Sequence, residues 1–259
     1  MIAKTYAEYA AEGLEPEILF WVGCAGSFDT RAQKVTRAVC DILNHVGIQF
    51  AILGNEERCT GDPARRAGNE FLFQMTALMN IETLNLYNVK KIVAACPHCF
   101  NTLKNEYPAL GGHYEVLHHS QLLQQLIAEG RLKVQGGEFK GKRITYHDSC
   151  YLGRANNVYE APREILAALD ADLVELKRSR QNGLCCGAGG GQMWKEDEPG
   201  DQRVNIERID EVLGVNPKAV VANCPFCITM LQDGLKAREK QDDVVVYDLS
   251  EMILNNMVR

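Results

Sequence analysis

Residues 219–227 read Ala-Val-Val-Ala-Asn-Cys-Pro-Phe-Cys, and residues 91–99 read Lys-Ile-Val-Ala-Ala-Cys-Pro-His-Cys. In both stretches a short apolar, β-branched run is followed at once by Cys-Pro-x-Cys. A run of this kind is typical of a strand that is buried on both faces, as in a parallel sheet. The sequence therefore predicts the same strand and the same cysteine loop twice, 128 positions apart.

The earlier cysteines of each half repeat in the same way. Cys24 and Cys59 are 35 positions apart, and so are Cys150 and Cys185. An apolar run also precedes the first cysteine of each half, at residues 18–22 and 144–146. An internal repeat of this length indicates a duplicated structural unit.

Between the apolar runs lie segments with helical periodicity. Apolar residues at helical spacing mark one face of each predicted helix. They are Val35, Val39, Ile42, Leu43 and Val46 in one helix, Phe71, Met75, Leu78 and Met79 in another, and Ile165, Leu166 and Leu169 in the second half. We expect these helices to cover the sheets.

Strands that alternate with helices predict an α/β fold. We expect two tandem, duplicated Rossmann-like half-domains with parallel sheets, and every ligand cysteine just after a strand. The carboxyl ends of parallel strands form the binding crevice of such sheets, so the cysteine loops can converge there.

The predicted domain organisation has four parts. Residues 1–17 form an N-terminal helical extension, and residues 18–129 form the first cysteine-rich repeat. Residues 130–143 are rich in glycine, lysine and charge and form a linker. Residues 144–259 form the second repeat.

The composition disfavours several classes of protein. A net charge of −6 argues against nucleic acid or an anionic membrane surface as the main partner, because both select basic patches. The first residues lack the regions of a signal peptide, and no run of about 18 apolar residues occurs. We therefore expect a cytoplasmic protein without direct membrane insertion, which reaches a membrane only through a partner. Because cytosolic reductants keep thiols reduced, its ten cysteines indicate metal binding or redox chemistry.

The repeated cysteines form two candidate ligand sets. Thiolates are soft ligands that suit zinc, copper(I) or iron–sulfur clusters. The sets are Cys24, Cys59, Cys96 and Cys99 in the first half, and Cys150, Cys185, Cys186, Cys224 and Cys227 in the second. The adjacent pair Cys185 and Cys186 would strain the chelate of a single zinc ion and suits a cluster of several metal atoms. Glycines from Gly187 onward would let backbone N–H groups approach cluster sulfides.

Other interpretations of these motifs stay open. Cys-Pro-His-Cys is also the active-site sequence of a periplasmic disulfide oxidant of thioredoxin fold. The cysteines suit structural zinc sites as well, mostly in the first half. The glycine run at residues 187–191 resembles a phosphate cradle, although no G-x-x-x-x-G-K-S/T motif is present.

Some residues near the motifs have a simpler interpretation. Cys40 fits neither set and is expected to be a small buried apolar residue. We expect Arg65 and Arg66 on a solvated helix face, and Trp194 with the acidic run 196–198 in an exposed loop. Four histidines lie near cysteine loops, but each is more often an ordinary hydrogen-bonded residue than a ligand. They are His98, His118, His119 and His147.

The spacing as a whole resembles a known family. Two copies of Cys-x(34)-Cys-Cys/Thr-Gly, each followed by Cys-Pro-x-Cys, resemble the CCG or cysteine-rich domain. This domain occurs in one heterodisulfide reductase subunit and in iron–sulfur subunits of glycolate oxidase, anaerobic glycerol-3-phosphate dehydrogenase and lactate-utilisation complexes. The stretch from Cys185 through Gly191 to Cys227 is similar in particular to electron-transfer-flavoprotein:menaquinone oxidoreductase-like proteins.

The resemblance implies cofactors for both sets. In the second repeat the five cysteines would hold a 4Fe-4S cluster, and the complete five-cysteine motif is associated with its noncubane form. In the first repeat Thr60 stands where Cys186 stands in the second. Because a hydroxyl is a poor iron ligand, the four remaining cysteines would hold a second iron–sulfur cluster or zinc.

The resemblance also predicts a function. The sequence has no ferredoxin cysteine motif and no flavin or nicotinamide fingerprint. We therefore expect an iron–sulfur electron-transfer subunit of a multi-subunit oxidoreductase. Electrons would come from a flavin- or ferredoxin-type donor subunit and pass toward a membrane quinone-reducing subunit or a disulfide. The alternatives are a catalytic disulfide or heterodisulfide reductase subunit that acts at its cluster, and a zinc-stabilised scaffold subunit.

Overall fold

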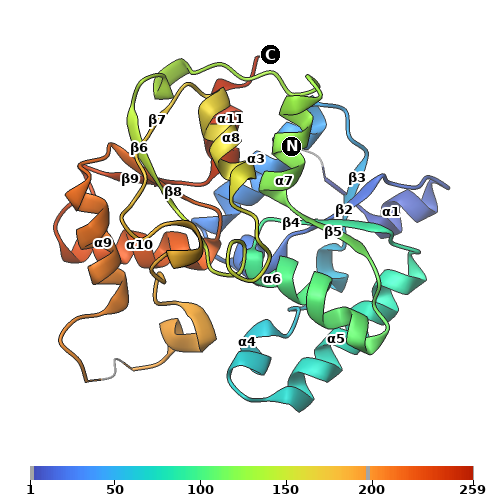
Figure 1. Ribbon diagram of the computed structural model, residues 1–259. Coiled ribbons are helices and arrows are strands. Elements are labelled where there is room, and N and C mark those ends of the chain that lie inside the picture. Colours follow the sequence, from blue (N-terminus) through green and yellow to red (C-terminus); the bar gives the residue numbers. More distant parts are fainter. Residues whose placement is uncertain (1–2, 197–198, 259) are drawn as a thin grey trace. The chain divides into compact units, whose positions relative to one another are not determined.

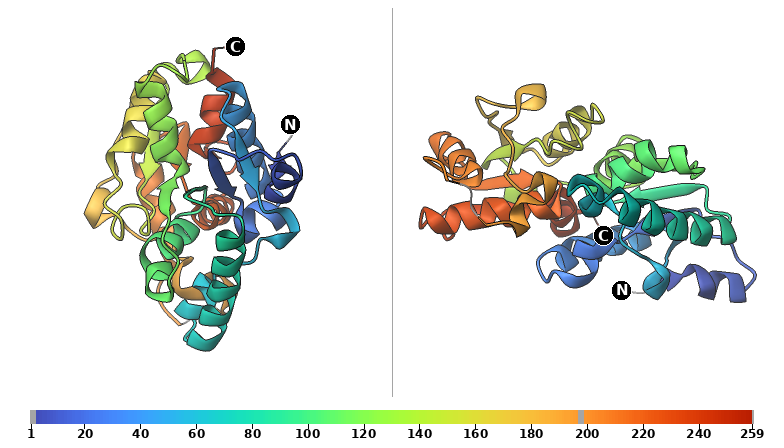
Figure 2. Two further views of the ribbon diagram at one scale, coloured as in Figure 1. Left: turned by 90° about the vertical axis from the view of Figure 1, so that its right-hand side faces the viewer. Right: turned by 90° about the horizontal axis from the view of Figure 1, so that it is seen from below.

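The computed structural model describes residues 3–196 and 199–258, and this part of the chain divides into two compact units after Leu122. Each unit is built on one sheet whose strand pairs are all parallel. The strand order is β1-β3-β2-β4-β5 in the first unit and β7-β6-β8-β9 in the second. Helices connect the strands within each unit (Figure 1 and Figure 2). The predicted α/β class with two parallel sheets is confirmed.

The strands are short, and β2, β4, β6 and β8 lie where the sequence predicts strands before cysteines. In the first unit they are β1 (Lys4–Thr5), β2 (Ile18–Trp21), β3 (Phe50–Ile52), β4 (Lys91–Ala94) and β5 (Glu115–His118). In the second they are β6 (Arg143–His147), β7 (Asp172–Leu173), β8 (Ala219–Ala222) and β9 (Val245–Tyr247). All four residues of β2 and of β8 are buried, which means that both faces of each sheet are covered at its centre.

The helices vary more in length than the strands. Up to the end of the first unit they are α1 (Tyr6–Ala11), α2 (Gly23–Phe28), α3 (Ala32–His45), α4 (Asp62–Arg66), α5 (Glu70–Leu86), α6 (Pro97–Asn101) and α7 (His119–Ala128), which runs across the division. The later helices are α8 (Glu160–Ala168), α9 (Val204–Gly214), α10 (Pro225–Ala237) and α11 (Leu249–Asn256). Among the described residues, none of these helices combines the length and apolar character needed to cross a bilayer.

The register of the central strands places the cysteine loops. Trp21, the last residue of β2, pairs with Ala94, the last residue of β4. In the second unit His147 pairs with Ala222 at the ends of β6 and β8 in the same way. Because both strand pairs are parallel and end level with each other, the loops that follow leave the same edge of the sheet.

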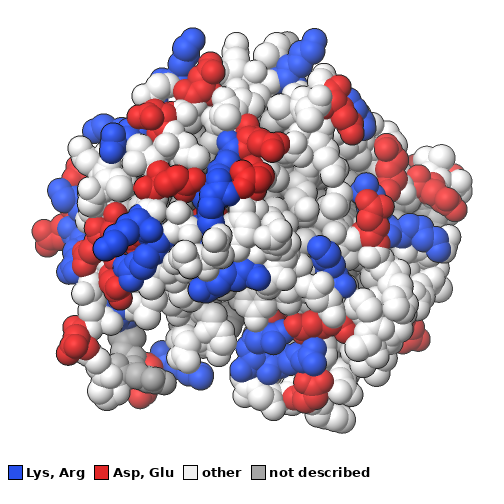
Figure 3. All heavy atoms as spheres, in the orientation of Figure 1, with Lys and Arg blue, Asp and Glu red and all other residues white. Residues whose placement is uncertain are grey.

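The prediction of which face of α5 is buried is wrong. Phe71 and Met75 are 75% and 44% exposed, and Leu78 and Met79 are also exposed. The opposite face packs on the core through Phe73, Ala77, Ile81 and Leu84. Both faces of this helix are apolar, so periodicity alone selects the wrong one. Figure 3 shows acidic and basic side chains mixed over much of this view, whereas the surface over α5 carries few of either.

The exposed loop predicted around residue 194 is only partly described. Trp194 is 60% exposed, and its ring meets the edge of Phe226 with 5.6 Å between centroids. Glu196 is exposed. Asp197 and Glu198, the rest of the acidic run, lie outside the described residues, as do residues 1 and 2 of the predicted extension.

The face that α5 buries can be tested with two leucines of the same helix. Leu84 is fully buried and Leu78 is 51% exposed. We expect Leu84→Ala to lower the free energy of unfolding by about 2–5 kcal/mol, because it leaves a cavity. The matched Leu78→Ala should change it by less than about 1 kcal/mol. Chemical denaturation of both variants checks this, and an equal loss would contradict the assignment.

Candidate metal centres

The five cysteines of the second repeat form a continuous chain of contacts. Hydrogen bonds link the thiols of Cys150 and Cys185, and then those of Cys185 and Cys186. Further bonds link Cys186 to Cys227 and Cys227 to Cys224. The structure brings all five side chains together, and their role as ligands stays a prediction.

The first repeat has a similar arrangement with one link changed. Hydrogen bonds pair Cys24 with Cys59 and Cys96 with Cys99. Thr60, at the position of Cys186, has its Oγ1 4.0 Å from Cys99 Sγ. The Thr60–Cys99 contact therefore repeats the Cys186–Cys227 contact of the second half, with a hydroxyl in place of a thiol.

The loops that carry the cysteines differ in length. Cys24, Cys96, Cys150 and Cys224 follow within three residues of β2, β4, β6 and β8. Cys59 and Cys185 lie seven and twelve residues beyond β3 and β7, each after a short 3₁₀ turn, so the expectation that every cysteine directly follows a strand is wrong for these two. Strands β3 and β7 end well before the site, and longer loops bring their cysteines back to it.

Helix N-termini face both cysteine sets. Pro97 and Pro225 each occupy the first helical position after a cysteine, where a missing N–H costs nothing. Cys99 and Cys227 lie in the first turn of these helices. The positive end of the helix dipole therefore favours negative charge on the Cys-Pro-x-Cys sulfurs.

The thiols hinder one another's ionisation. Hydrogen bonds to neighbouring cysteines, followed by burial, raise the pKa of the thiols of Cys24, Cys99, Cys150 and Cys186. The hydrogen bond with Cys24 lowers the pKa of Cys59 to about 7, and the bond with Cys150 lowers the pKa of Cys185. The negative charge of one thiolate in each set thus makes ionisation of the other thiols less favourable. Metal cations among the sulfurs would reverse this effect, so the donor sets fit a metal centre.

A carboxylate braces two cysteine loops in each repeat. Glu57, on the loop before Cys59, accepts hydrogen bonds from the backbone N–H groups of Val22 and Gly23 at 3.0 and 2.5 Å. Burial raises the pKa of the Glu57 carboxyl to about 7. In the second repeat Asp148, on the loop before Cys150, accepts the N–H of Arg180 at 2.7 Å. In both repeats the bond joins the loops of the first and second cysteines. The carboxylate lies on the second of these loops in the first repeat and on the first of them in the second repeat.

One glycine in each repeat makes a tight turn beside a thiol. Gly61 and Gly187 have φ of +88° and +92°, a region in which residues with a Cβ are strained. Their N–H groups donate to Cys59 Sγ at 3.5 Å and to Cys185 Sγ at 3.3 Å. The predicted approach of backbone N–H groups to sulfur thus occurs at Gly187 and again at Gly61.

Three polar residues lie beside the second centre that the sequence either marked as ordinary or did not mark at all. A ring nitrogen of His147 and the sulfurs of Cys186 and Cys227 all lie within 4.8 Å of one another. Ser149 Oγ lies 3.5 Å from Cys227 Sγ. Arg208 is fully buried on α9, and its Nε donates to His147 Nδ1 at 3.0 Å. His147 and Ser149 could have been found from their places just before Cys150, whereas no local signal marks Arg208.

The first centre is supported from the corresponding helix. Asn80, fully buried on α5, donates through Nδ2 to the carbonyl of Cys59 at 2.9 Å and to the Tyr107 hydroxyl at 3.0 Å. This residue holds the Cys59 loop in place, and the sequence analysis did not select it.

The other predicted residues have ordinary surroundings. Cys40 is buried on α3, and burial raises its pKa to about 12. His98 Nδ1 lies 2.8 Å from Asp62 Oδ2. The His118 and His119 rings are 4.4 Å apart. The expectation of a solvated face for Arg65 and Arg66 is wrong in part, because both pair with Glu106 and are only partly exposed.

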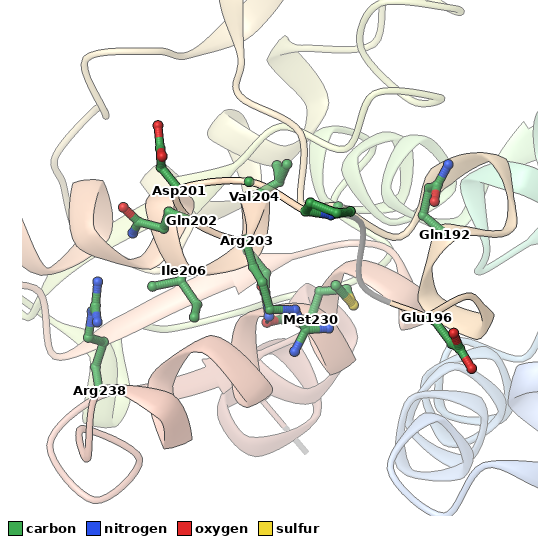
Figure 4. A pocket seen from close by; sticks show the side chains of 13 residues that line it. Gln192, Glu196, Asp201, Gln202, Arg203, Val204, Ile206, Met230 and Arg238 are labelled. Carbon is green, nitrogen blue, oxygen red and sulfur yellow. The ribbon is translucent and has the colours of Figure 1, made fainter.

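A hollow lies beside the second centre. Its volume is about 750 Å³, and Gly187, directly after the cysteine pair, forms part of its wall with Asn205 and Met230. Figure 4 shows Arg203 and Met230 near the middle of the hollow, with Arg238 at one end and Glu196 at the other. Both charge signs line it, so it has no uniform preference for an anion.

The arrangement of the cysteines agrees with a family comparison. The sequence model of the CCG cysteine-rich domain matches residues 18–104 and 144–232. The chain belongs to the CCG cysteine-rich domain family. Both CCG copies contain the full set of cysteines of their repeat, from Cys24 to Cys99 and from Cys150 to Cys227.

Curated relatives are similar to this chain over nearly its whole length. The probable iron–sulfur-binding oxidoreductase FadF of Bacillus subtilis is 49% identical over 98% of this chain and 36% of its own length. The EtfAB:quinone oxidoreductase of Syntrophomonas wolfei is 47% identical over 95% of this chain and 35% of its own length. The matched subunit of the dihydromethanophenazine:CoB–CoM heterodisulfide reductase of Methanosarcina barkeri is 35% identical over 92% of this chain and 58% of its own length. The chain thus spans about a third to three fifths of the length of these relatives.

The turn glycines of the CCG copies can be tested by adding a methyl group. A Cβ on Gly61 would lie 2.9 Å from a Phe73 ring carbon and 3.2 Å from Phe73 Cα, whereas on Gly187 it would lie 3.3 Å from the flexible end of Met230. Gly68 has φ of +89° with nothing within 4 Å, so Gly68→Ala measures the backbone cost alone, about 1–2 kcal/mol. We expect Gly61→Ala to lower the free energy of unfolding further than Gly68→Ala. Equal losses in chemical denaturation would contradict the predicted clash.

Proposed function

We propose that this chain is an iron–sulfur electron-transfer subunit of a multi-subunit oxidoreductase. In this proposal Cys150, Cys185, Cys186, Cys224 and Cys227, in the repeat at residues 144–259, hold a 4Fe-4S cluster. The observation that carries the proposal is the unbroken chain of five thiols, which includes an adjacent pair of cysteines. A zinc ion takes four ligands in a tetrahedron and would leave one thiol over. A cluster of several irons can use all five, which favours the noncubane form.

The first repeat, at residues 18–129, holds a second metal centre in the same proposal. Its ligands are Cys24, Cys59, Cys96 and Cys99, and Thr60 does not replace the missing thiol. Four thiols fit either a cubane iron–sulfur cluster or a zinc ion, and we favour the cluster because the two repeats share their loop geometry.

The chain's own residues would shape these centres. A bound cluster supplies reversible one-electron transfer. Around it, the N–H groups of Gly61 and Gly187 and the N-termini of α6 and α10 favour negative charge on the sulfurs. Burial of Cys96, Cys99, Cys186, Cys224 and Cys227 excludes water.

Partners follow from the relatives. One is named an EtfAB:quinone oxidoreductase and another a heterodisulfide reductase subunit, and the matched region is only part of each. We infer that a flavin- or ferredoxin-type subunit or domain delivers electrons to this chain, and that a membrane quinone-reducing partner receives them.

One observation favours the second candidate, a catalytic disulfide reductase. The 750 Å³ hollow has Gly187 in its wall, so a small thiol or disulfide bound there would lie beside the loop of Cys185 and Cys186. Reduction of a disulfide to two thiols takes two electrons and two protons, and the electrons would come from the donor partner. A disulfide that changes the paramagnetic signal of the second centre, and is then turned over with a reductant, would favour this candidate over a relay.

The proposal is tested first by metal analysis of anaerobically purified protein. We expect iron and acid-labile sulfide in cluster amounts and a paramagnetic resonance signal that changes with reduction. Cys186→Ser should lose or alter the second centre, because it removes the thiol that links Cys185 to Cys227. Cys40→Ser is the matched control, since Cys40 is buried on α3 outside both sets. Zinc without sulfide in the unchanged protein would favour the scaffold alternative and refute the electron-transfer proposal.

The missing thiol of the first repeat gives a converse test. Thr60 already lies beside Cys99, so Thr60→Cys restores the link that Cys186 makes in the second repeat. We expect the optical and paramagnetic spectra of the first centre to shift toward those of the second. Thr60→Val, which removes the hydroxyl without adding a ligand, is the control. Identical spectra for the two variants, with equal iron content, would contradict the ligand set proposed for the first repeat.

A further inference from the structure

We propose that His147 is a positioning residue of the second centre, which donates a hydrogen bond from Nε2–H to a cluster-bound sulfur and thereby raises the reduction potential. The proposal rests on the iron–sulfur function proposed for the second repeat. It adds to that function a residue that acts on the electron affinity of the cluster without binding iron.

The His147 ring is buried beside the thiols of the second centre. His147 is the last residue of β6, it is 1% exposed, and it precedes Cys150 by three positions. One of its ring nitrogens lies within 4.8 Å of both Cys186 Sγ and Cys227 Sγ, which are linked to each other in the thiol chain. The ring is thus close enough to the sulfurs to act on a metal centre that they hold, as a ligand or as a hydrogen-bond donor.

Arg208 decides the tautomer of the His147 ring. A guanidinium has only N–H donors, and a neutral imidazole has one donor and one acceptor. Because Arg208 Nε donates to His147 Nδ1 at 3.0 Å, the lone pair at Nδ1 is used and the proton is assigned to Nε2. A nitrogen that carries a proton has no lone pair for iron. Because Nδ1 is used by Arg208, Nε2 is the nitrogen that would act toward the sulfurs, as a donor and not as a ligand.

Arg208 is itself held in place by further hydrogen bonds. Its side chain is fully buried on α9, and Nη1 donates to the carbonyl of Arg178 at 2.9 Å and to Glu211 Oε2 at 3.1 Å. Turning the guanidinium away from His147 would break these bonds in a dry environment, which is costly. The ring of His147 is thus held in one orientation from behind.

The first repeat supplies independent support. Trp21 occupies the equivalent position, at the end of β2 and three positions before Cys24. Its indole offers only an N–H donor, and within the described residues Nε1 is buried and has no hydrogen-bond partner. Trp21 Cδ1, next to Nε1, lies 4.0 Å from the point where a Cβ on Gly23 would sit, and this point is 3.3 Å from Cys99 Sγ. Two different rings therefore place an N–H group at the same end of the central strand.

The consequence is electrostatic. Reduction adds negative charge to a cluster and its thiolates, so a hydrogen bond to sulfur stabilises the reduced form more than the oxidised form. Loss of one such bond should make reduction less favourable by about tenfold in the equilibrium constant, which is about 59 mV for a one-electron couple. The potential of the second centre should therefore fall when the donor is removed.

The experiment compares three variants of the full chain, purified anaerobically. His147→Phe keeps a ring and removes the donor. His147→Gln can still accept from Arg208 through its carbonyl and donate toward sulfur through its amide. Thr145→Val is the matched control on the same strand, because it breaks the Thr145–Val174 hydrogen bond of 2.7 Å and leaves the donor in place. Iron, sulfide and the midpoint potential of each paramagnetic signal are measured for all.

We expect His147→Phe to keep its iron and sulfide and to lower the midpoint potential of the second centre, while His147→Gln and Thr145→Val stay close to the unchanged protein. An unchanged potential in His147→Phe at full iron content overturns the proposal. Loss of iron from the second centre in this variant, with iron kept in His147→Gln, also overturns it, because it indicates a ligand or a structural ring. Absence of iron and sulfide from the unchanged protein instead refutes the proposed function itself.

A measurement on the unchanged sequence keeps the proposal testable if a variant does not fold. Pulsed paramagnetic resonance of protein labelled with ¹⁵N-histidine should show a weak nitrogen coupling and an exchangeable proton coupled to the second centre. A strong coupling, as in centres with histidine bound to iron, overturns the donor role. So does the absence of any histidine coupling.

Discussion

The parallel pairing of two central strands is the constraint on which both centres depend. Strands β2 and β4 end level with each other, and so do β6 and β8. Their loops consequently leave the sheet side by side, so that Gly23 approaches Cys99 and Ser149 contacts Cys227. A shift of one residue in either pairing would turn the strand-end side chains to the opposite face of the sheet.

The loops of Cys59 and Cys185 are held by polar contacts, because β3 and β7 end seven and twelve residues before these cysteines. Glu57 and Asp148 each accept a backbone N–H from the neighbouring loop, and Asn80 holds the carbonyl of Cys59. A polar group removed from water in this way is costly unless it is bonded, so these contacts define one loop geometry. The thiols then lie close enough that a thiolate at Cys59 or Cys185 raises the pKa of its neighbours, which is why the site suits cations.

The sequence predicts the features that depend on local pattern. The apolar runs before the cysteines are strands because a strand buried on both faces needs continuous apolar residues, and the spacing of Cys24 and Cys59 recurs because the unit is duplicated. The face of α5 was mispredicted because Phe71 and Phe73 lie on opposite sides of an apolar helix, and only the sheet decides which side is buried. Arg208 could not be predicted at all, since it meets His147 across 61 positions of sequence.

The two repeats differ at the donors around the sulfurs more than at the sulfurs themselves. Four of the five cysteine positions are shared, whereas His147 replaces Trp21, Ser149 replaces Gly23 and Arg208 replaces Asn80. Ser149 gives the second repeat a further hydroxyl and Arg208 a buried cation, while the first repeat has the Glu57 carboxyl close to Cys59. Hydrogen-bond donors and cations favour added negative charge. These differences would therefore change the reduction potential of a bound centre, while the fold stays the same. The two repeats thus share the loops that bring the thiols together. They differ in the polar and charged groups around the thiols that would bind metal.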